Sequence, residues 1–225
     1  MKNKVFILKI VTPLLMLISA CNKPSTNLIY NGSSEIPGYD TIPKGWQNIK
    51  GNWTAAEGDS VHPNSAIAQD SSHYFFAGYG LLCILQQDVK VDQYATTIDN
   101  KKQQFILSGF EQTLDQGLLS DQGMLKVECL DATKKILDSS RTDTLMSKTK
   151  WKAVTETFLS PASTRFIRVQ LVAFRNVGGD NDGYFDNIRL VALPYQNYLL
   201  IIFLITIVIV ATGSFVYFRK KRVIK

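Results

Sequence analysis

The chain has 225 residues and a mass of 25.2 kDa, which limits it to one domain of ordinary size with appendages, or to two small ones. Apolar residues make up 45% and charged residues 20%, so a globally disordered chain is excluded. Of the 25 Lys and Arg, three precede residue 10 and five follow residue 218, which leaves 17 against all 19 Asp and Glu. A nucleic-acid-binding surface is therefore not expected. With two His and three Cys, dense metal or disulfide chemistry is not expected either.

The first twenty residues have the pattern of a secretory signal. Lys2 and Lys4 precede an apolar run over 10–18 that is too short to span a bilayer, and small residues follow it directly before polar sequence. The ending Ile18-Ser19-Ala20-Cys21 resembles the lipobox of bacterial lipoproteins, which implies cleavage after residue 20 and lipidation of Cys21. The alternative is an ordinary signal peptide or an uncleaved anchor with a coincidental Cys. A linker is expected over 21–26.

The segment 27–192 is predicted to be all-β. Short runs of β-branched and aromatic residues alternate with Gly, Asn, Asp and Ser, and no stretch keeps a helical period for more than two turns. We expect strands over 27–31, 45–49, 73–77, 81–89, 103–110, 124–131, 150–158, 164–173 and 183–191. This number of strands suits an antiparallel two-sheet sandwich of jelly-roll type.

Several motifs of this segment resemble galactose-binding-domain-like modules, which include carbohydrate-binding module families. The opening Asn27-Leu-Ile-Tyr-Asn-Gly-Ser-Ser-Glu35, followed by Gly45-Trp46 and Trp53, is similar to the first strand of that fold. The closing stretch 181–190, Asn-Asp-Gly-Tyr-Phe-Asp-Asn-Ile-Arg-Leu, is similar to its last strand. One departure is Ser34, where a large apolar residue is usual. The resemblance covers nearly the whole exported part and implies a binding module more often than a catalyst.

The resemblance also implies a metal site. It places Glu35 just after the first strand and Asp186 in the last one, where several modules of this fold share a structural calcium ion with backbone carbonyls. Hard oxygen ligands on neighbouring strands suit Ca²⁺. The alternative is that Asp186 accepts turn hydrogen bonds while Glu35 is solvated. The acidic loop 178–183 lacks the spacing of an EF-hand and is predicted to be a tight turn.

Glycan recognition would use exposed aromatic rings, because the C–H faces of sugars stack on them. Alternate residues of a strand point inward, so about half of the candidate rings belong to the core, together with Trp46 and Trp53. The candidate ligand contacts are Tyr74, Phe76, Tyr79 and Tyr184, with Phe75 and Phe110 as further rings of the same set.

Other chemistry finds little support. Cys83 and Cys129 could form a disulfide after export, but two buried free thiols fit the sequence equally well. Neither His62 nor His73 has the context of a catalytic triad or a zinc site, and the chain has no Gly-rich phosphate loop or HExxH motif. The sequence therefore predicts a protein that is not an enzyme.

The C-terminal region is predicted to be a membrane anchor. Residues 198–218 form a run of 21 residues without a charge, which as a helix would be about 31 Å long and would match the hydrocarbon core. The basic tail 219–225 follows and should stay cytoplasmic. The tail also resembles the PEP-CTERM signals that exosortase-type enzymes cut, although Leu193-Pro194-Tyr195-Gln196 lacks the Pro-Glu-Pro of that family.

These features combine into one hypothesis and one rival. The hypothesis is a bacterial envelope protein in the cell membrane, with a lipid at Cys21, one C-terminal span and its globular domain outside the cytoplasm. That domain would recognise glycan or another envelope component. The rival is a structural or assembly protein that contacts a protein partner and binds no sugar.

Overall fold

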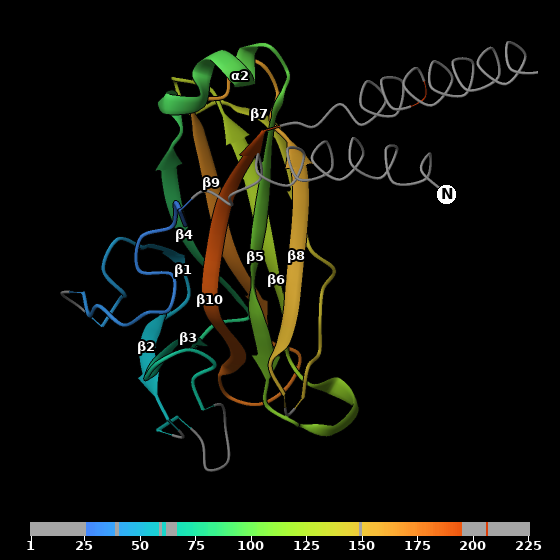
Figure 1. The fold of residues 1–225 in the computed structure, drawn as a ribbon. Coiled ribbons are helices and arrows are strands. Elements are labelled where there is room, and N and C mark those ends of the chain that lie inside the picture. The colour runs from blue at the N-terminus through green and yellow to red at the C-terminus, as the bar shows by residue number, and fades with distance from the viewer. Residues whose placement is uncertain are drawn as a thin grey trace, which may run out of the picture. The chain divides into compact units, whose positions relative to one another are not determined.

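The chain folds into two antiparallel sheets that pack face to face, as Figure 1 shows for a computed structural model that describes residues 26–38, 41–58, 60–61, 67–148, 150–194 and 206. In the strand order of sheet A, the elements are β1 (Gln47–Lys50), β4 (Leu82–Lys90), β9 (Phe166–Phe174), β6 (Gln122–Leu130) and β7 (Ile136–Arg141). In sheet B they are β2 (Thr54–Glu57), β3 (His73–Gly78), β10 (Asn181–Pro194), β5 (Gln103–Thr113) and β8 (Lys152–Leu159). The predicted sandwich of two antiparallel sheets is confirmed.

The prediction of a strand over 27–31 is wrong. This segment pairs with β10 through isolated bonds and not through a strand ladder. Leu28 N–H donates to the Leu190 carbonyl at 2.8 Å and Ile188 N–H donates to the Gly32 carbonyl at 2.8 Å, while the Asn27 side chain also bonds to the backbone of β10. The backbone turns away at Asn31, whose φ of 54° lies in the left-handed region that strands do not use. The pair Asn31-Gly32 is a turn signal, but the apolar run before it favoured a strand in the prediction.

Two strands are absent from the sequence-based prediction. The first, β2, is short, and the second, β7, is exposed along nearly its whole length. Both lie at an edge of their sheet, so neither needs a regular apolar face. Apolar periodicity is the main sequence signal for a strand, and these two strands lack it.

The core lies between the sheets. Trp53, Phe75, Phe105 and Phe185 are among its fully buried side chains, and Trp46 packs edge-on against Phe75 with ring centroids 5.0 Å apart. The expected core positions of Trp46 and Trp53 are thus confirmed. Burial of each such side chain stabilises the fold by roughly 1.5–3 kcal/mol.

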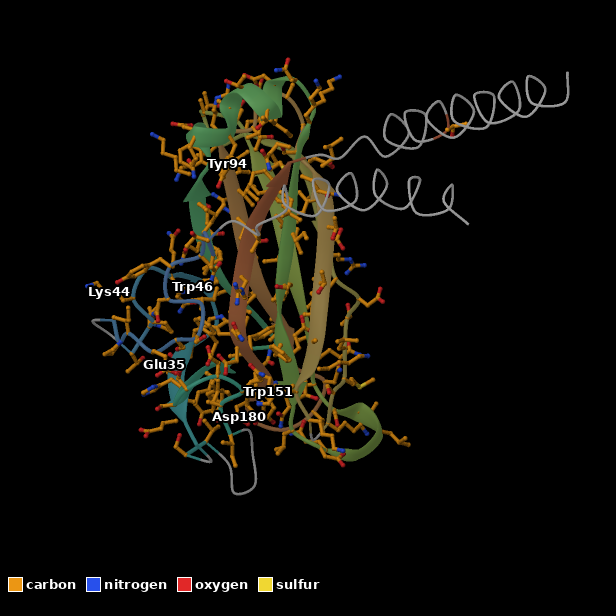
Figure 2. The ribbon with its side chains drawn as sticks, in the orientation of Figure 1. Glu35, Lys44, Trp46, Tyr94, Trp151 and Asp180 are labelled. Carbon is orange, nitrogen blue, oxygen red and sulfur yellow. The ribbon has the colours of Figure 1, made fainter. Side chains whose placement is uncertain are left out.

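The two ends of the sandwich differ. One end carries the short 3₁₀ turn η1 (Asp92–Tyr94) and helix α2 (Ala95–Asp99), and Figure 2 shows Tyr94 there, where its ring packs edge-on against Phe105 at 5.7 Å. The other end carries long loops, including η2 (Gly117–Leu119). None of the helices in the described residues has the length and hydropathy needed to cross a bilayer. The predicted signal over 1–20, Cys21, the span 198–218 (apart from residue 206) and the tail 219–225 lie outside the described residues.

Candidate functional site

The outward-facing side of sheet A has a polar middle, beside which Ile84, Met124 and Val172 form an apolar row. Side chains alternate along each strand, so that fully buried Leu85 of β4 and Val169 of β9 point into the core while Gln86 and Gln170 point away from it. The strand registers place further polar residues on the same side. The set is referred to below as the sheet A face: Gln47, Lys50, Gln86, Asp88, Lys126, Glu128, Arg141, Arg168 and Gln170.

A row of amides crosses the middle of the sheet A face. The Nε2 of Gln86 donates to Oε1 of Gln47 at 3.2 Å, and the Nε2 of Gln170 donates to Oε1 of Gln86 at 3.1 Å. The strand register continues the row from Gln170 to Lys126 and from Lys126 to Arg141. Neighbouring strands lie about 4.8 Å apart, so the five-strand row is about 19 Å long. An extended ligand could lie along it.

A second row, one pleat away, consists of ion pairs. Arg168 holds Asp88 with two bonds, from Nε to Oδ1 at 2.7 Å and from Nη2 to Oδ2 at 3.1 Å, and its Nη1 lies 3.5 Å from Glu128 Oε2. Lys134 pairs with Asp88 at 2.9 Å and Lys126 with Glu128 at 2.6 Å. These five residues form one chain of alternating charge.

The pKa values of the central pair of this row, Asp88 and Arg168, are shifted toward the charged forms. Burial alone would raise the pKa of Asp88, but hydrogen bonds from Arg168 and Lys134 outweigh it, and the pKa lies below its ordinary value. The hydrogen bond to Asp88 raises the pKa of Arg168, and burial offsets only part of that rise. The ion-pair row therefore places fixed charges beside the amide row.

The opposite outer surface, on sheet B, holds most of the predicted ligand rings. Tyr74, Phe76 and Tyr184 form a second apolar cluster there, and they are 0%, 9% and 0% exposed. Partly buried residues cover the cluster: Val61, Ala68, Leu114 and Trp151. The rings expected to be open to a ligand are thus closed, because loops pack on them.

Trp151 is the residue of this cluster that sequence reasoning missed. Its ring packs edge-on against Tyr74 with centroids 6.1 Å apart, and its Nε1 donates to the Ile67 carbonyl at 2.7 Å. Figure 2 shows Trp151 toward the loop end of the molecule. Trp151 lies just before β8, where the sequence pattern is that of an exposed edge strand. The local sequence therefore does not predict that its ring packs over Tyr74.

The remaining predicted rings are scattered. Tyr79 is 67% exposed, in the turn between β3 and β4. Phe75 belongs to the core between the sheets, and Phe110 is half-buried on β5 opposite Asp186 of β10. Of the candidate ligand contacts Tyr74, Phe76, Tyr79 and Tyr184, only Tyr79 has a largely open ring.

Glu35 and Asp186 both hold the segment 69–73, which leads into β3. Oε1 of Glu35 accepts the N–H of Ser72 at 2.9 Å and that of His73 at 2.7 Å, and its Oε2 lies 3.1 Å from Nδ1 of His73. Oδ2 of Asp186 accepts the N–H of Gln69 at 2.8 Å and that of Asp70 at 2.9 Å. Figure 2 shows Glu35 near β2 and β3.

These surroundings decide how well a calcium ion fits. Backbone N–H groups and a His ring surround the two carboxylates, and Oδ1 of Asp186 accepts a further N–H, from Asn187 at 2.6 Å. A cation needs oxygen ligands there instead of hydrogen-bond donors. The described residues contain no group of three or more His, Cys, Asp or Glu placed to hold a metal. The donor set therefore does not fit Ca²⁺.

Burial perturbs two carboxyl groups outside the sheet A face. It raises the pKa of Asp186 to about 7, although the hydrogen bonds of Asp70, Asn187 and Gln69 oppose the rise. It raises the pKa of Glu111 to about 8. Glu111 is 1% exposed and points between the sheets, and neither of its carboxyl oxygens has a hydrogen-bond partner.

The neighbours of Glu111 explain that isolation. The N–H of Leu125 and the hydroxyl of Thr142 lie near enough to oppose the rise of its pKa, together with Lys152. That N–H nevertheless donates to Oγ1 of Thr142 at 3.0 Å, and the hydroxyl lies 3.5 Å from the Leu125 carbonyl. Neither group is therefore in hydrogen-bonding geometry with the carboxyl, and Glu111 holds its proton at neutral pH.

The two cysteines and the acidic loop have structural surroundings. Cys83 and Cys129 are buried free thiols, which settles the alternative that the sequence left open. The loop 178–183 turns into β10 as predicted, and buried Asp121 holds it. Oδ1 of Asp121 accepts the N–H of Asn176 at 2.7 Å, and its Oδ2 accepts that of Asp182 at 2.8 Å.

Comparison with known proteins defines the class of fold. No protein-family model matches the chain, and no curated protein matches it. A cyclase from Fischerella sp. TAU is similar in structure, with a TM-score of 0.56 and 14% identity, over 78% of this chain and 100% of that one. The enzymatically active domain of tailspike protein 4 of bacteriophage CBA120 is similar with a TM-score of 0.51 and 13% identity, over 74% of this chain and 21% of that one.

Carbohydrate-binding modules are also among the neighbours. A family 16 carbohydrate-binding module matches with a TM-score of 0.47 and 17% identity, over 73% of this chain and 99% of that one. The similarities to the cyclase and to the tailspike domain show that the fold is shared and nothing more. The function must be argued from the residues of this chain.

Proposed function

We propose that this protein is a membrane-anchored, extracytoplasmic and non-catalytic module that binds glycan on the sheet A face. One observation carries the proposal, namely the amide row Gln47–Gln86–Gln170 on the outward side of sheet A, which runs from exposed Gln47 to Gln86 and Gln170, 7% and 9% exposed. A side-chain amide both donates and accepts hydrogen bonds, as sugar hydroxyls do. The ion-pair row beside it holds its long side chains in place, which reduces the entropy lost on binding.

The binding role is tested by substitution in the amide row. The purified full-length protein is screened on a glycan array and in pull-down assays with insoluble polysaccharides. The double variant Gln86→Ala, Gln170→Ala should lose glycan binding and keep its fold. Gln104→Ala is the matched control, because this half-buried Gln of β5 faces outward from sheet B, where Leu159 and Leu193 are its partners in the register.

If the unsubstituted protein binds no glycan in either assay, the proposal fails. It also fails if Gln104→Ala abolishes binding while the double variant retains it. Circular dichroism of each variant separates lost binding from lost structure.

The membrane anchoring rests on the sequence. The apolar run 198–218, the basic tail after it and the lipobox-like ending at Cys21 support a domain held outside the cytoplasm by a lipid and one span. An intact mass of the protein from its native membrane tests this. Loss of residues 1–20 with a gain of acyl chains and retention of Lys225 is expected, whereas a mass short by about thirty C-terminal residues would indicate a cleaved sorting signal.

A protein partner is the second candidate, and one observation favours it. The edge strand β7 is exposed along its length, and Ile136 and Leu137 are 51% and 38% exposed. An edge strand offers unpaired backbone groups to another chain. Crosslinking in native membranes that traps one defined protein neighbour through β7, combined with no glycan binding, would replace the first candidate with this one.

A further inference from the structure

The sheet A face is more basic than the rest of the domain. Between its two terminal basic groups the chain has 17 Lys and Arg against 19 Asp and Glu. The face nevertheless carries Lys50, Lys126, Arg141 and Arg168 against Asp88 and Glu128, and Lys134 reaches it from the turn before β7. Positive charge is therefore concentrated on one face of a nearly neutral domain.

Both carboxylates of the face are already engaged. Asp88 pairs with Arg168 and Lys134, and Glu128 pairs with Lys126 and Arg168. Within the described part of the chain, Arg141 differs from Arg168 because no carboxylate lies within ion-pair distance of it. Its polar contact is Sδ of Met124, 3.4 Å from Nη1. A thioether sulfur is a weak acceptor, so Arg141 keeps most of its hydrogen-bonding capacity.

Arg141 lies at one end of the amide row. It is exposed on β7, and the register pairs it with Lys126 of β6, which in turn pairs with Gln170 of β9. A ligand that lies along the row would meet neutral amides over β1, β4 and β9, and then two cations over β6 and β7. A guanidinium group binds a carboxylate with two parallel hydrogen bonds, which a Lys ammonium cannot do.

A nucleic acid fits this arrangement less well than an acidic sugar. The other cation of the face without a carboxylate partner among the described residues, Lys50, lies on β1 at the opposite edge, about 19 Å from Arg141 across the sheet. Recognition of a nucleic-acid backbone requires a continuous stripe of free cations. Here neutral amides lie between the two, beside an ion-pair row whose cations are engaged with Asp88 and Glu128.

We propose that the glycan bound by the sheet A face is an acidic one, with a uronic acid carboxylate held by Arg141 at the β7 end of the amide row. This inference rests on the glycan-binding function proposed above. It adds the class of ligand, its direction along the row and the residue that selects it.

The test compares one polymer with and without its charge. Polygalacturonate and fully methyl-esterified pectin share a backbone, and the ester removes the carboxylate charge. Binding of the purified full-length protein to each is measured by affinity electrophoresis at low and high salt. We expect polygalacturonate to bind at least about tenfold more tightly than the ester, with weaker binding at high salt.

Substitutions then assign the effect. Arg141→Gln should lower the affinity for polygalacturonate about tenfold. Arg141→Lys should restore only part of it, because Lys restores the positive charge but cannot form the two parallel hydrogen bonds of a guanidinium group. Arg189→Gln is the matched control and should stay close to the unsubstituted protein, because this exposed Arg lies on β10 of sheet B and forms no ion pair with a described residue. Arg141→Gln should leave the melting temperature unchanged, since Arg141 is exposed and forms no ion pair with a described residue.

The outcomes separate this inference from the proposed function. If the protein binds neutral glycans as well as polygalacturonate and Arg141→Gln has no effect, the acidic preference is overturned and glycan binding stands. If it binds no polysaccharide of either kind, both are overturned. If a single-stranded oligonucleotide displaces polygalacturonate at equal charge concentration, the sheet A face binds polyanions by their charge alone. The assignment of a uronic acid is then overturned.

Discussion

The outer surfaces of the two sheets have opposite character. The surface of sheet B carries aromatic residues, among them Tyr74 and Tyr184, and loop residues such as Trp151 cover it. The sheet A face carries amides and charges that bond to one another within the face. An apolar surface is stabilised by being covered, whereas a laterally satisfied polar surface gains nothing from a cover. Strands rich in aromatic residues therefore need not present open rings, because in this protein loop residues cover them.

The largest expected effect is on the covered side. Tyr184→Ala removes a fully buried ring that packs edge-on against Tyr74 at 5.5 Å, and should lower the free energy of unfolding by about 3–5 kcal/mol. Urea unfolding of the purified full-length protein measures this. Glycan binding per folded molecule should not change. A loss below about 1 kcal/mol together with lost binding would reverse the roles of the two surfaces.

A pH dependence should come from the interior between the two surfaces. The folded state raises the pKa of Glu111 from its ordinary value of 4.5 to about 8, so the folded protein keeps a proton that the unfolded chain has released. The stability is fully present below the ordinary value and is lost as the pH rises through about 8, by an amount on the order of a few kcal/mol.

Thermal unfolding between pH 5 and pH 9 measures this loss, with Glu111→Gln as the variant. The substitution should flatten most of the profile and raise the melting temperature at pH 8. Asp186, whose pKa burial raises to about 7, should supply what slope remains. An unchanged profile in Glu111→Gln would show that Glu111 is not the group responsible.

A smaller effect is expected at the anchored segment that leads into sheet B. Glu35→Gln weakens the acceptor of two backbone N–H groups and of the His73 ring, and should cost about 1–3 kcal/mol in the free energy of unfolding. Because backbone amides surround Glu35 and Asp186, EDTA and added CaCl₂ should leave the melting temperature of the unsubstituted protein unchanged. A shift of several degrees with calcium, lost in Glu35→Gln, would show instead that these carboxylates hold the ion.

The smallest effect on stability is expected on the sheet A face. Gln170→Ala removes one buried amide–amide hydrogen bond, to Gln86, and should change the free energy of unfolding by about 1 kcal/mol. The same substitution should weaken glycan binding severalfold, as isothermal titration measures. A large loss of stability without a change in binding would show that the amide row belongs to the scaffold.

Much of the scaffold was predictable from local sequence. Alternation in segments such as 124–131 and 164–173 places one side of each strand in the core, because the side-chain period of a strand is two residues. The same rule, combined with two large rings, predicted the core positions of Trp46 and Trp53. This rule did not predict the edge strands β2 and β7, because an exposed strand needs no apolar side.

The candidate site was less predictable, because it depends on how strands distant in sequence are registered. Gln86 and Gln170 are 84 positions apart in the chain and meet only because β4 and β9 are neighbours in sheet A. Likewise, nothing near Tyr74 or Tyr184 in the sequence shows that Trp151 covers them.

By itself, the sequence determined the all-β class, the two apolar terminal segments and the basic residues beside them, since these follow from composition and period. Only the tertiary structure decided which surface is covered, which carboxylates are already paired and which arginine of the sheet A face lacks a carboxylate partner among the described residues. Those properties depend on contacts between distant segments, and residue type and spacing along the chain do not encode them.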